Sequence, residues 1–259
     1  MEQGQYAAYP RKPIREIDFG VISEGFSIVT KNWLPFAIAS IVLVLIAGLI
    51  EMGMIFLVLT VLGPAPSDPS DLGAVMSYTG REYAITIPGS LIMWAAMSPV
   101  LLSYSMMTLK HIRGQEIQVG DVALGFSRFG QAAIVVIINQ VAAMVGTLAC
   151  IVGSLWVAGR LMLAIPVLAD KEIAPMEAVR ESWVLTGPHM WMAMLLYFVV
   201  SLVSGLGIIA CCVGILITIP LLYVCSTLVY RDLSGMTAIP ATPQPNIGVP
   251  PTDENQEQS

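Results

Sequence analysis

Residues 33–62 read WLPFAIASIVLVLIAGLIEMGMIFLVLTVL, and the only charged side chain in this stretch is Glu51. About 20 apolar residues cross the hydrocarbon of a bilayer as an α-helix, because each residue adds about 1.5 Å. The stretch therefore predicts a membrane-spanning helix. Two further stretches, 131–169 and 189–230, are also strongly apolar, and each is long enough for two crossings.

The chain as a whole is poor in charge. Of its 259 residues, 56% are hydrophobic and 12% are charged, and the mean hydropathy is +0.77, whereas a soluble domain has about 25% charged residues. Backbone polar groups must be paired within lipid, so the apolar runs are expected to be helices and not open strands. We predict an all-α integral membrane protein with six transmembrane helices, over about 33–60, 85–108, 131–150, 153–169, 189–208 and 212–231.

A pattern that recurs three times groups these helices in pairs. Each copy begins with Glu-Ile, continues as an amphipathic stretch and an apolar hairpin, and carries a proline in the second leg of the hairpin. The Glu-Ile pairs begin at Glu16, Glu116 and Glu172, and the prolines are Pro99, Pro166 and Pro220. The pattern predicts an approximate threefold internal repeat with units 16–110, 116–170 and 172–232. Each proline is expected to kink its helix, either as a flexing point or as a fixed bend that helps the legs pack.

The amphipathic stretches have apolar residues at helical spacing. The apolar positions are Phe19, Ile22, Phe26 and Val29, then Val119, Val122, Phe126 and Phe129, and in a looser third copy Met176, Val179 and Trp183. Spacings of three and four place such residues on one face of a helix. We expect a cytoplasmic interfacial helix before each hairpin, lying flat at the headgroup boundary. The alternative is a plain cytoplasmic connector packed on the bundle.

Basic residues indicate the orientation. Ten of them fall on one side of a six-span topology: Arg11, Lys12, Arg15, Lys31, Lys110, Arg113, Arg128, Lys171, Arg180 and Arg231. The opposite side keeps only Arg81, so both termini are expected in the cytoplasm. Around a six-span domain over 16–235 we expect a flexible basic arm over 1–15, an outer loop over 63–83 and a disordered Pro-rich acidic tail over 236–259.

Four polar side chains lie inside the spans and are the candidate binding residues: Glu51, Arg160, Asn139 and Gln140. A charge within the membrane costs roughly 2.5–3.5 kcal/mol on insertion scales and marks a candidate functional site. Glu51 and Arg160 could form a buried pair that lines a polar cavity. Alternatively, Glu51 lies in the outer headgroups and Arg160 snorkels or bonds to carbonyls. The two amides could contact a ligand or bond to a neighbouring helix.

No motif predicts a catalytic centre, a cofactor or a metal site. His111 and His189 lack an acidic or serine partner at a recognisable spacing. The cysteines lack zinc-site spacing, and there is neither a phosphate-binding loop nor a basic patch suited to nucleic acid. Cys150 could form a disulfide with Cys211 or Cys212, or these residues could simply pack as small side chains.

The third unit resembles a known family. It reads LAIPVL at 163–168, EAVRESWVLT at 177–186 and YRDL at 230–233, and Arg160 precedes the first of these motifs. These features resemble the membrane domain attached to some glycerophosphoryl diester phosphodiesterases, and the YciC-like inner-membrane proteins, best over about 110–235. The resemblance implies a multi-pass protein of the bacterial plasma (inner) membrane with a largely unassigned role. It does not imply phosphodiesterase activity, which belongs to a separate soluble domain of those proteins.

We therefore expect a non-enzymatic membrane scaffold, or a component of a membrane transport or envelope process. Its expected partners are the lipid bilayer and other membrane proteins. One alternative is a carrier for a lipid or small amphiphile with a central polar cavity. The other is a membrane-embedded lipid hydrolase or transferase, for which only Asp170, Glu172 and Asp232 gather near one face.

Overall fold

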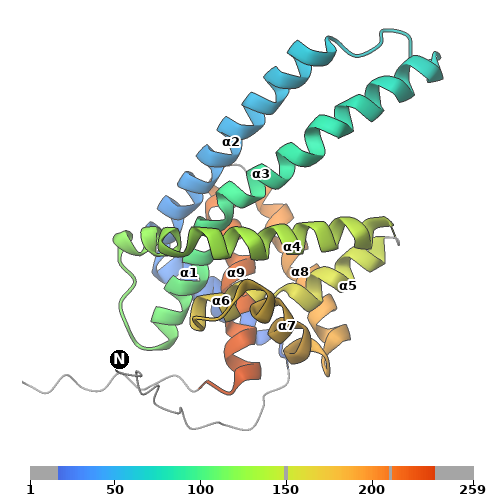
Figure 1. The fold of residues 1–259 in the computed structure, drawn as a ribbon. Helices are drawn as coiled ribbons and strands as arrows, with labels where there is room; N and C mark the ends of the chain where they lie inside the picture. The colour runs from blue at the N-terminus through green and yellow to red at the C-terminus, as the bar shows by residue number, and fades with distance from the viewer. Residues whose placement is uncertain (1–16, 149–150, 210–211, 237–259) are drawn as a thin grey trace, which may run out of the picture.

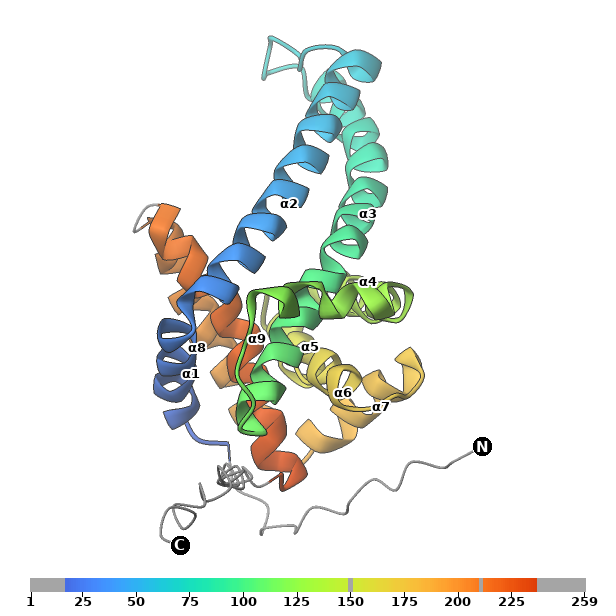
Figure 2. The ribbon, with the colours of Figure 1, turned by 90° about the vertical axis from the view of Figure 1, so that its left-hand side faces the viewer.

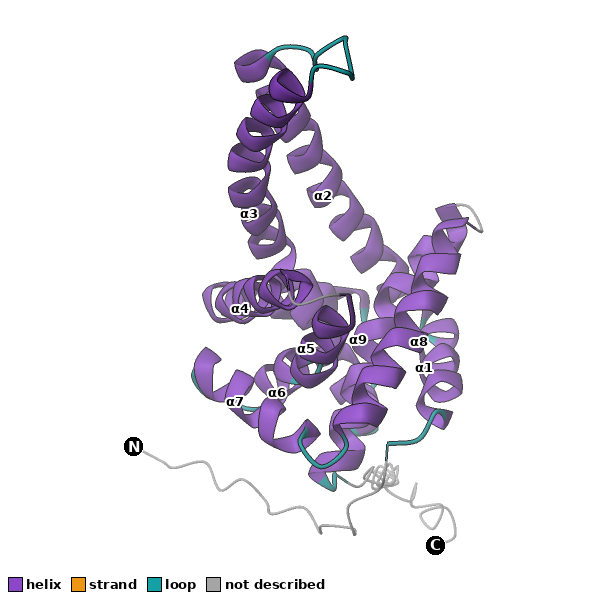
Figure 3. Ribbon diagram, turned by 90° about the vertical axis from the view of Figure 1, so that its right-hand side faces the viewer, coloured by secondary structure: helices purple, strands orange, loops and turns teal. Residues whose placement is uncertain are grey.

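The structure, a computed structural model, describes residues 17–148, 151–209 and 212–236 (Figure 1). These residues form helices and no strand (Figure 3). The helices are α1 (Gly20–Lys31), α2 (Trp33–Leu62), α3 (Leu72–Ile112), the 3₁₀-helix η1 (Val119–Arg128), α4 (Phe129–Leu148), α5 (Ile151–Leu161), α6 (Ala164–Asp170), α7 (Pro175–Thr186), α8 (Met190–Ile209) and α9 (Cys212–Ser234). The arm over 1–15, the tail from 237 onward, Cys150, Cys211 and the side chain of Cys212 lie outside the described residues, and so does the expected disulfide.

Five helical segments are long and apolar enough to cross a membrane: Trp33–Leu62, Leu72–Ile112, Val119–Leu148, Val152–Asp170 and Leu216–Ser234. Helices α7 and α8, which meet at a bend of 107°, form a sixth candidate if they are counted as one span. The described part of the chain is therefore an all-helical protein with five or six possible membrane crossings. This agrees with the expectation of a multi-pass membrane protein.

Consecutive long helices pack side by side. Helix α2 contacts α3, α4 contacts α5, and α8 contacts α9. The three pairs diverge from a common base: α2 and α3 rise away from the other helices, whereas α4 and α5 run across the view of Figure 1 (Figures 1 and 2). Glycine permits close approach within a pair, because a Cβ at Gly146 of α4 would lie 2.9 Å from the Cα of Ser154 in α5.

The main core lies where the second legs of the pairs meet. Helices α3, α6 and α9 contact one another, and Leu102, Leu168 and Leu228, one from each helix, are fully buried. A hydrogen-bonded cluster ties the ends of the same three helices. Arg113, which caps α3, forms an ion pair with Asp170 of α6, and the Tyr230 hydroxyl of α9 donates to the other oxygen of Asp170 at 2.8 Å.

Pro99 and Pro220 lie inside α3 and α9, and each leaves one carbonyl without a helical N–H partner. Serine hydroxyls donate to both of these carbonyls. The pairs are Ser98 Oγ with the Ala95 carbonyl at 2.7 Å, and Ser40 Oγ of α2 with the Leu216 carbonyl at 3.2 Å. Ser40 shares its single proton between Leu216 and the Phe36 carbonyl of its own helix, which lies 2.9 Å away. Hydroxyl side chains commonly satisfy backbone groups that proline frees inside membrane helices.

Pro166 lies in α6, directly after a break in the helix. Helix α5 ends at Leu161 and α6 begins at Ala164. A proline at 166 cannot donate to the carbonyl of Met162, which lies in this break. The second leg of this pair is therefore interrupted, whereas α3 and α9 continue through their prolines.

Each short amphipathic helix packs on the second leg of a different pair. Helix α1 contacts α9, η1 contacts α3, and α7 contacts α5 and α6. Small residues face these contacts: Gly25, Gly125 and Ala178 are buried. The large apolar residues point outward, since Phe26 is 51% exposed and Phe126 is 48% exposed. The helices thus pack on the protein through these small residues and, in α1 and η1, also through buried Val29 and Val122, while their phenylalanines face the surroundings.

Ion pairs reinforce these three contacts. Lys110 at the end of α3 binds both carboxylate oxygens of Asp121 in η1 at 2.7 Å. Lys171, which follows α6, pairs with Glu181 of α7. Arg231 of α9 pairs with Glu24 of α1, with Nη2 and Oε2 3.0 Å apart.

The outer loop expected over 63–83 is shorter than predicted, because α3 begins at Leu72. Asp71 caps this helix by accepting a hydrogen bond from the Ala74 amide at 3.0 Å, and residues 72–84 contain no proline to interrupt it. With 41 residues, α3 is about 60 Å long, roughly twice the thickness of the hydrocarbon. In the remaining loop, hydrogen bonds from the hydroxyl and amide of Ser70 lower the pKa of Asp68.

Candidate functional site

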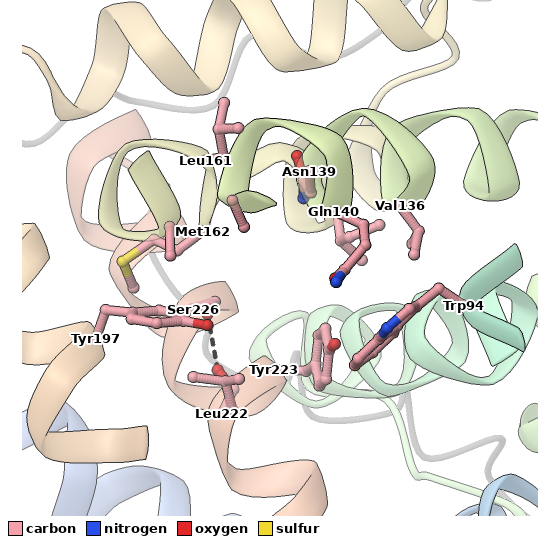
Figure 4. A pocket seen from close by; sticks show the side chains of 13 residues that line it. Trp94, Val136, Asn139, Gln140, Leu161, Met162, Tyr197, Leu222, Tyr223 and Ser226 are labelled. Atoms are coloured by element: carbon pink, nitrogen blue, oxygen red, sulfur yellow. Dashed lines mark hydrogen bonds between the residues drawn. The ribbon is translucent and has the colours of Figure 1, made fainter. Parts of the chain in front are cut away.

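A cavity of about 170 Å³ lies between α3, α4, α5, α6, α8 and α9. Its polar and aromatic lining residues are Trp94, Asn139, Gln140, Tyr197, Tyr223 and Ser226, and the rest of the wall is aliphatic (Figure 4). These side chains come from four helices that are distant in sequence. A mostly apolar wall with a few polar groups is typical of a site for a small organic ligand.

Asn139 and Gln140 are the polar centre of this cavity. Figure 4 shows the Gln140 amide extending from α4 toward Trp94 and Tyr223. The Asn139 side-chain oxygen is buried and has no hydrogen-bond partner among the described residues. The interhelical hydrogen bonds that we considered for these amides are absent among the described residues, because the cavity separates α4 from α9 at this level. Both side chains are therefore free to bond to a ligand or to water.

The volume of the cavity limits what it can hold. An apolar cavity of about 150 Å³ in another protein accommodates benzene, and a water molecule takes about 30 Å³. The present cavity is therefore suited to one aromatic ring or a short alkyl chain. It is too small to enclose a whole phospholipid.

Arg160 lies on the other side of α5 from the cavity. Ala158, Leu161 and Met162 line the cavity, and residues two apart on a helix point to different faces. The Arg160 carbonyl accepts hydrogen bonds from α7, from the Ser182 hydroxyl at 2.8 Å and the Thr186 hydroxyl at 3.1 Å. Arg160 is thus anchored to α7 through its backbone.

Aromatic rings cover the guanidinium group of Arg160. The guanidinium carbon lies 4.3 Å from the centre of the Trp183 ring. Trp156, one turn before Arg160, packs edge-on against Trp183 with 5.3 Å between the ring centres. The resulting cation–π contact partly offsets the cost of burying this charge.

The buried ion pair considered for Glu51 and Arg160 is not formed. Glu51 is exposed on the outer part of α2, and Arg160 is buried beside α7. None of the ion pairs among the described residues includes either side chain. The pair fails because α2 diverges from α5, so Glu51 does not line the cavity (Figure 2).

The carboxylates considered for catalysis have partners or are exposed. Asp170 binds Arg113 and Tyr230, Asp232 binds Arg231, and Glu172 is exposed. Within the described ranges, no group of three or more His, Cys, Asp or Glu side chains could hold a metal ion.

The fold and the cavity define a class: a multi-pass, all-helical membrane protein with a small, partly polar cavity between its helices. Comparisons with protein-family models, with curated proteins and with solved structures found no match to this chain.

The aromatic members of the cavity were not identified from the sequence. Trp94, Tyr197 and Tyr223 lie in apolar runs, where an aromatic ring is unremarkable unless the facing helices are known. Asn139 and Gln140 were identified because an amide in such a run is costly and stands out.

Proposed function

We propose that this protein binds a small amphiphile in the cavity and acts without catalysing a reaction. The observation that carries this proposal is the pair of amides, Asn139 and Gln140, which face the cavity without hydrogen-bond partners in the described chain. An alcohol or headgroup could bond to these amides while its hydrocarbon part contacts Trp94 and Tyr223.

A binding or scaffold role is favoured over transport through a central pore. The second legs α3, α6 and α9 meet in a packed core with fully buried leucines, and the cavity that borders on all three of these helices has a volume of only about 170 Å³. A packed centre supports the scaffold interpretation, and the cavity supports a bound amphiphile. We therefore favour a membrane component that holds a ligand, with a carrier for a lipid or small amphiphile as the alternative.

We further propose that the chain is built from three helical hairpins in an approximate threefold repeat. The three ion pairs support this, because each joins a cation near the end of a second leg to an acid on a short helix. Each short helix contacts the second leg of the unit before it, and α1 contacts that of the last unit, so that the contacts form a closed ring. The outward-facing Phe26 and Phe126 support short helices that lie in the membrane interface.

We propose a plasma-membrane location with both termini in the cytoplasm. The distribution of Lys and Arg supports this orientation, and the family resemblance described above supports the inner membrane of a bacterium. A lipid hydrolase or transferase is disfavoured because Asp170 and Asp232 already bind basic side chains.

The cavity can be tested with a photoreactive alcohol, a diazirine-bearing octanol, added to the purified full-length protein. We expect ultraviolet irradiation to attach it to residues 136–143 or 222–226, as mapped by peptide mass spectrometry. Ala143→Phe should fill the cavity and abolish labelling. Val145→Phe is the matched control, because Val145 lies on the same helix and is exposed. Labelling of Ala143→Phe at wild-type level, or no labelling of wild type in these segments, would contradict the proposal.

A further inference from the structure

Arg160 is a buried cation with no anion beside it among the described residues. The residue is 7% exposed, and its Nε is buried without a hydrogen-bond partner. No described residue accepts a hydrogen bond from the guanidinium group or forms an ion pair with it. Burying an unpaired charge is strongly unfavourable, so such residues normally have a carboxylate or other acceptor beside them.

The contact with Trp183 compensates for only part of this cost. A cation–π contact is weaker than the ion pair or charge-assisted hydrogen bonds that a buried guanidinium normally forms. The ring covers the face of the guanidinium, whereas the N–H donors point outward in the guanidinium plane. The donors of Arg160, above all the buried Nε–H, therefore have no acceptor oxygen among the described residues.

Gly187 lies beside the edge of the guanidinium, in the turn between α7 and α8. A Cβ at this position would lie 3.4 Å from Nη1 of Arg160. Glycine at this position keeps a side chain away from the edge of the guanidinium, where the carbonyl oxygens of Val184 and Trp183 would also lie within 3.6 Å of such a Cβ. This edge is separate from the amphiphile cavity, which lies on the opposite face of α5.

We propose that Arg160 binds a phosphate oxyanion at the junction of α5, α7 and α8. The planar fork of arginine matches two oxygens of a phosphate, and such charge-assisted bonds are among the strongest in proteins. Trp183 covers one face of the guanidinium, and Trp156 packs edge-on against Trp183. The anion is either the phosphate of a lipid headgroup or free phosphate, and binding does not depend on the proposed amphiphile site.

The test uses the purified full-length protein in a neutral detergent at fixed ionic strength. Three probes are added separately: dioctanoyl phosphatidic acid, dioctanoylglycerol and inorganic phosphate. The melting temperature and the tryptophan fluorescence are measured as each is titrated. Dioctanoylglycerol has the same chains without the phosphate, so it reports binding that does not involve the anion.

We expect phosphatidic acid to raise the melting temperature of the wild type and to change its tryptophan fluorescence, whereas dioctanoylglycerol has no effect. A response to inorganic phosphate as well would identify free phosphate as a sufficient ligand. Arg160→Met should weaken binding at least tenfold. The control Arg180→Met removes the same charge from an exposed position of α7 and should bind as the wild type does.

Two results would overturn the proposal. The first is a wild-type protein that responds to neither phosphate compound, which decides the matter even if Arg160→Met does not fold. The second is equal loss of binding in Arg160→Met and Arg180→Met, since this would indicate attraction to general positive charge and not to the Arg160 site.

Discussion

Arg231 near the end of the last helix, α9, forms an ion pair through both terminal nitrogens with Glu24 of the first helix, α1. Arg231 also donates from Nε to its neighbour Asp232 at 2.9 Å. The contact joins segments that are 207 positions apart in the chain. It is therefore a tertiary contact that holds the N-terminal amphipathic helix against the C-terminal hairpin.

Removing the acid of this pair should destabilise the protein. Glu24→Gln leaves Arg231 with only Asp232 as its acidic partner. Because Glu24 is partly solvated, we expect the free energy of unfolding to fall by about 1 kcal/mol, which is at the upper end for such pairs. For a chain of this size this corresponds to a melting temperature lower by about 2–4 °C. Thermal unfolding in detergent measures the effect.

The control for this prediction is Glu172→Gln, which removes an exposed acid from a loop and should leave the melting temperature unchanged. A double-mutant cycle with Arg231→Gln isolates the pairwise contribution. A coupling energy of zero would show that the pair does not hold α1 in place.

Replacing Gly125 even by alanine should strongly destabilise the protein. A Cβ at this position would lie 1.9 Å from the Pro99 carbonyl oxygen, a backbone atom that cannot move aside alone. We expect Gly125→Ala to separate η1 from α3 and to cost about 3 kcal/mol or more, at the top of the range for overpacking. Gly120→Ala in the same helix has open space around it and is the control. Equal expression and melting temperature for the two variants would show that η1 does not pack as described.

The Ser40 hydroxyl should stabilise the protein, because it donates to the Leu216 carbonyl that Pro220 leaves without a helical N–H donor. Tyr104 contacts the Ser40 hydroxyl at 2.9 Å, and Ser40 in turn contacts the Leu216 carbonyl. We expect Ser40→Ala to cost about 1–2 kcal/mol, because it leaves buried polar groups unpaired. In a Pro220→Ala background the helix regains its own N–H donor to Leu216, so the cost of Ser40→Ala should fall. Thermal unfolding of the four proteins in the cycle tests this, and additive effects would refute the coupling.

The Gln140 amide should form a hydrogen bond with the hydroxyl group of an alcohol bound in the cavity. We expect Gln140→Leu to reduce photolabelling by the diazirine octanol about fivefold, since one hydrogen bond contributes roughly 1 kcal/mol. A photoreactive alkane of the same length should label the wild type and this variant equally. Stronger alcohol labelling in Gln140→Leu than in the wild type would mean that the amide does not bond to the ligand.

Much of the helical architecture could be predicted from hydropathy, because a run such as 33–62 has no alternative to a helix in lipid. The start of α3 was predicted too late. Residues 72–84 are too polar to resemble a membrane span, yet they extend the same helix outside it. The 3₁₀ geometry of η1 was also not predicted, since the 3.6-residue spacing of its apolar positions favours an α-helix.

The site could be predicted only in part, because a sequence does not say which helix faces meet. Asn139 and Gln140 stood out as polar residues in an apolar run, and both line the cavity. Arg160 stood out for the same reason but faces Trp183 on the opposite side of α5. Its pairing with Glu51 could not be judged without knowing that α2 diverges from α5.

We propose that the three short helices lie at one face of the membrane and the α2–α3 turn at the other. Single cysteines at Gln115, Glu177 and Ser70, each in a background without native cysteines, test it by labelling intact and inverted membrane vesicles with a membrane-impermeant maleimide. We predict that positions 115 and 177 react from the cytoplasmic side and position 70 from the opposite side. Labelling of 115 and 177 from opposite sides would contradict this orientation.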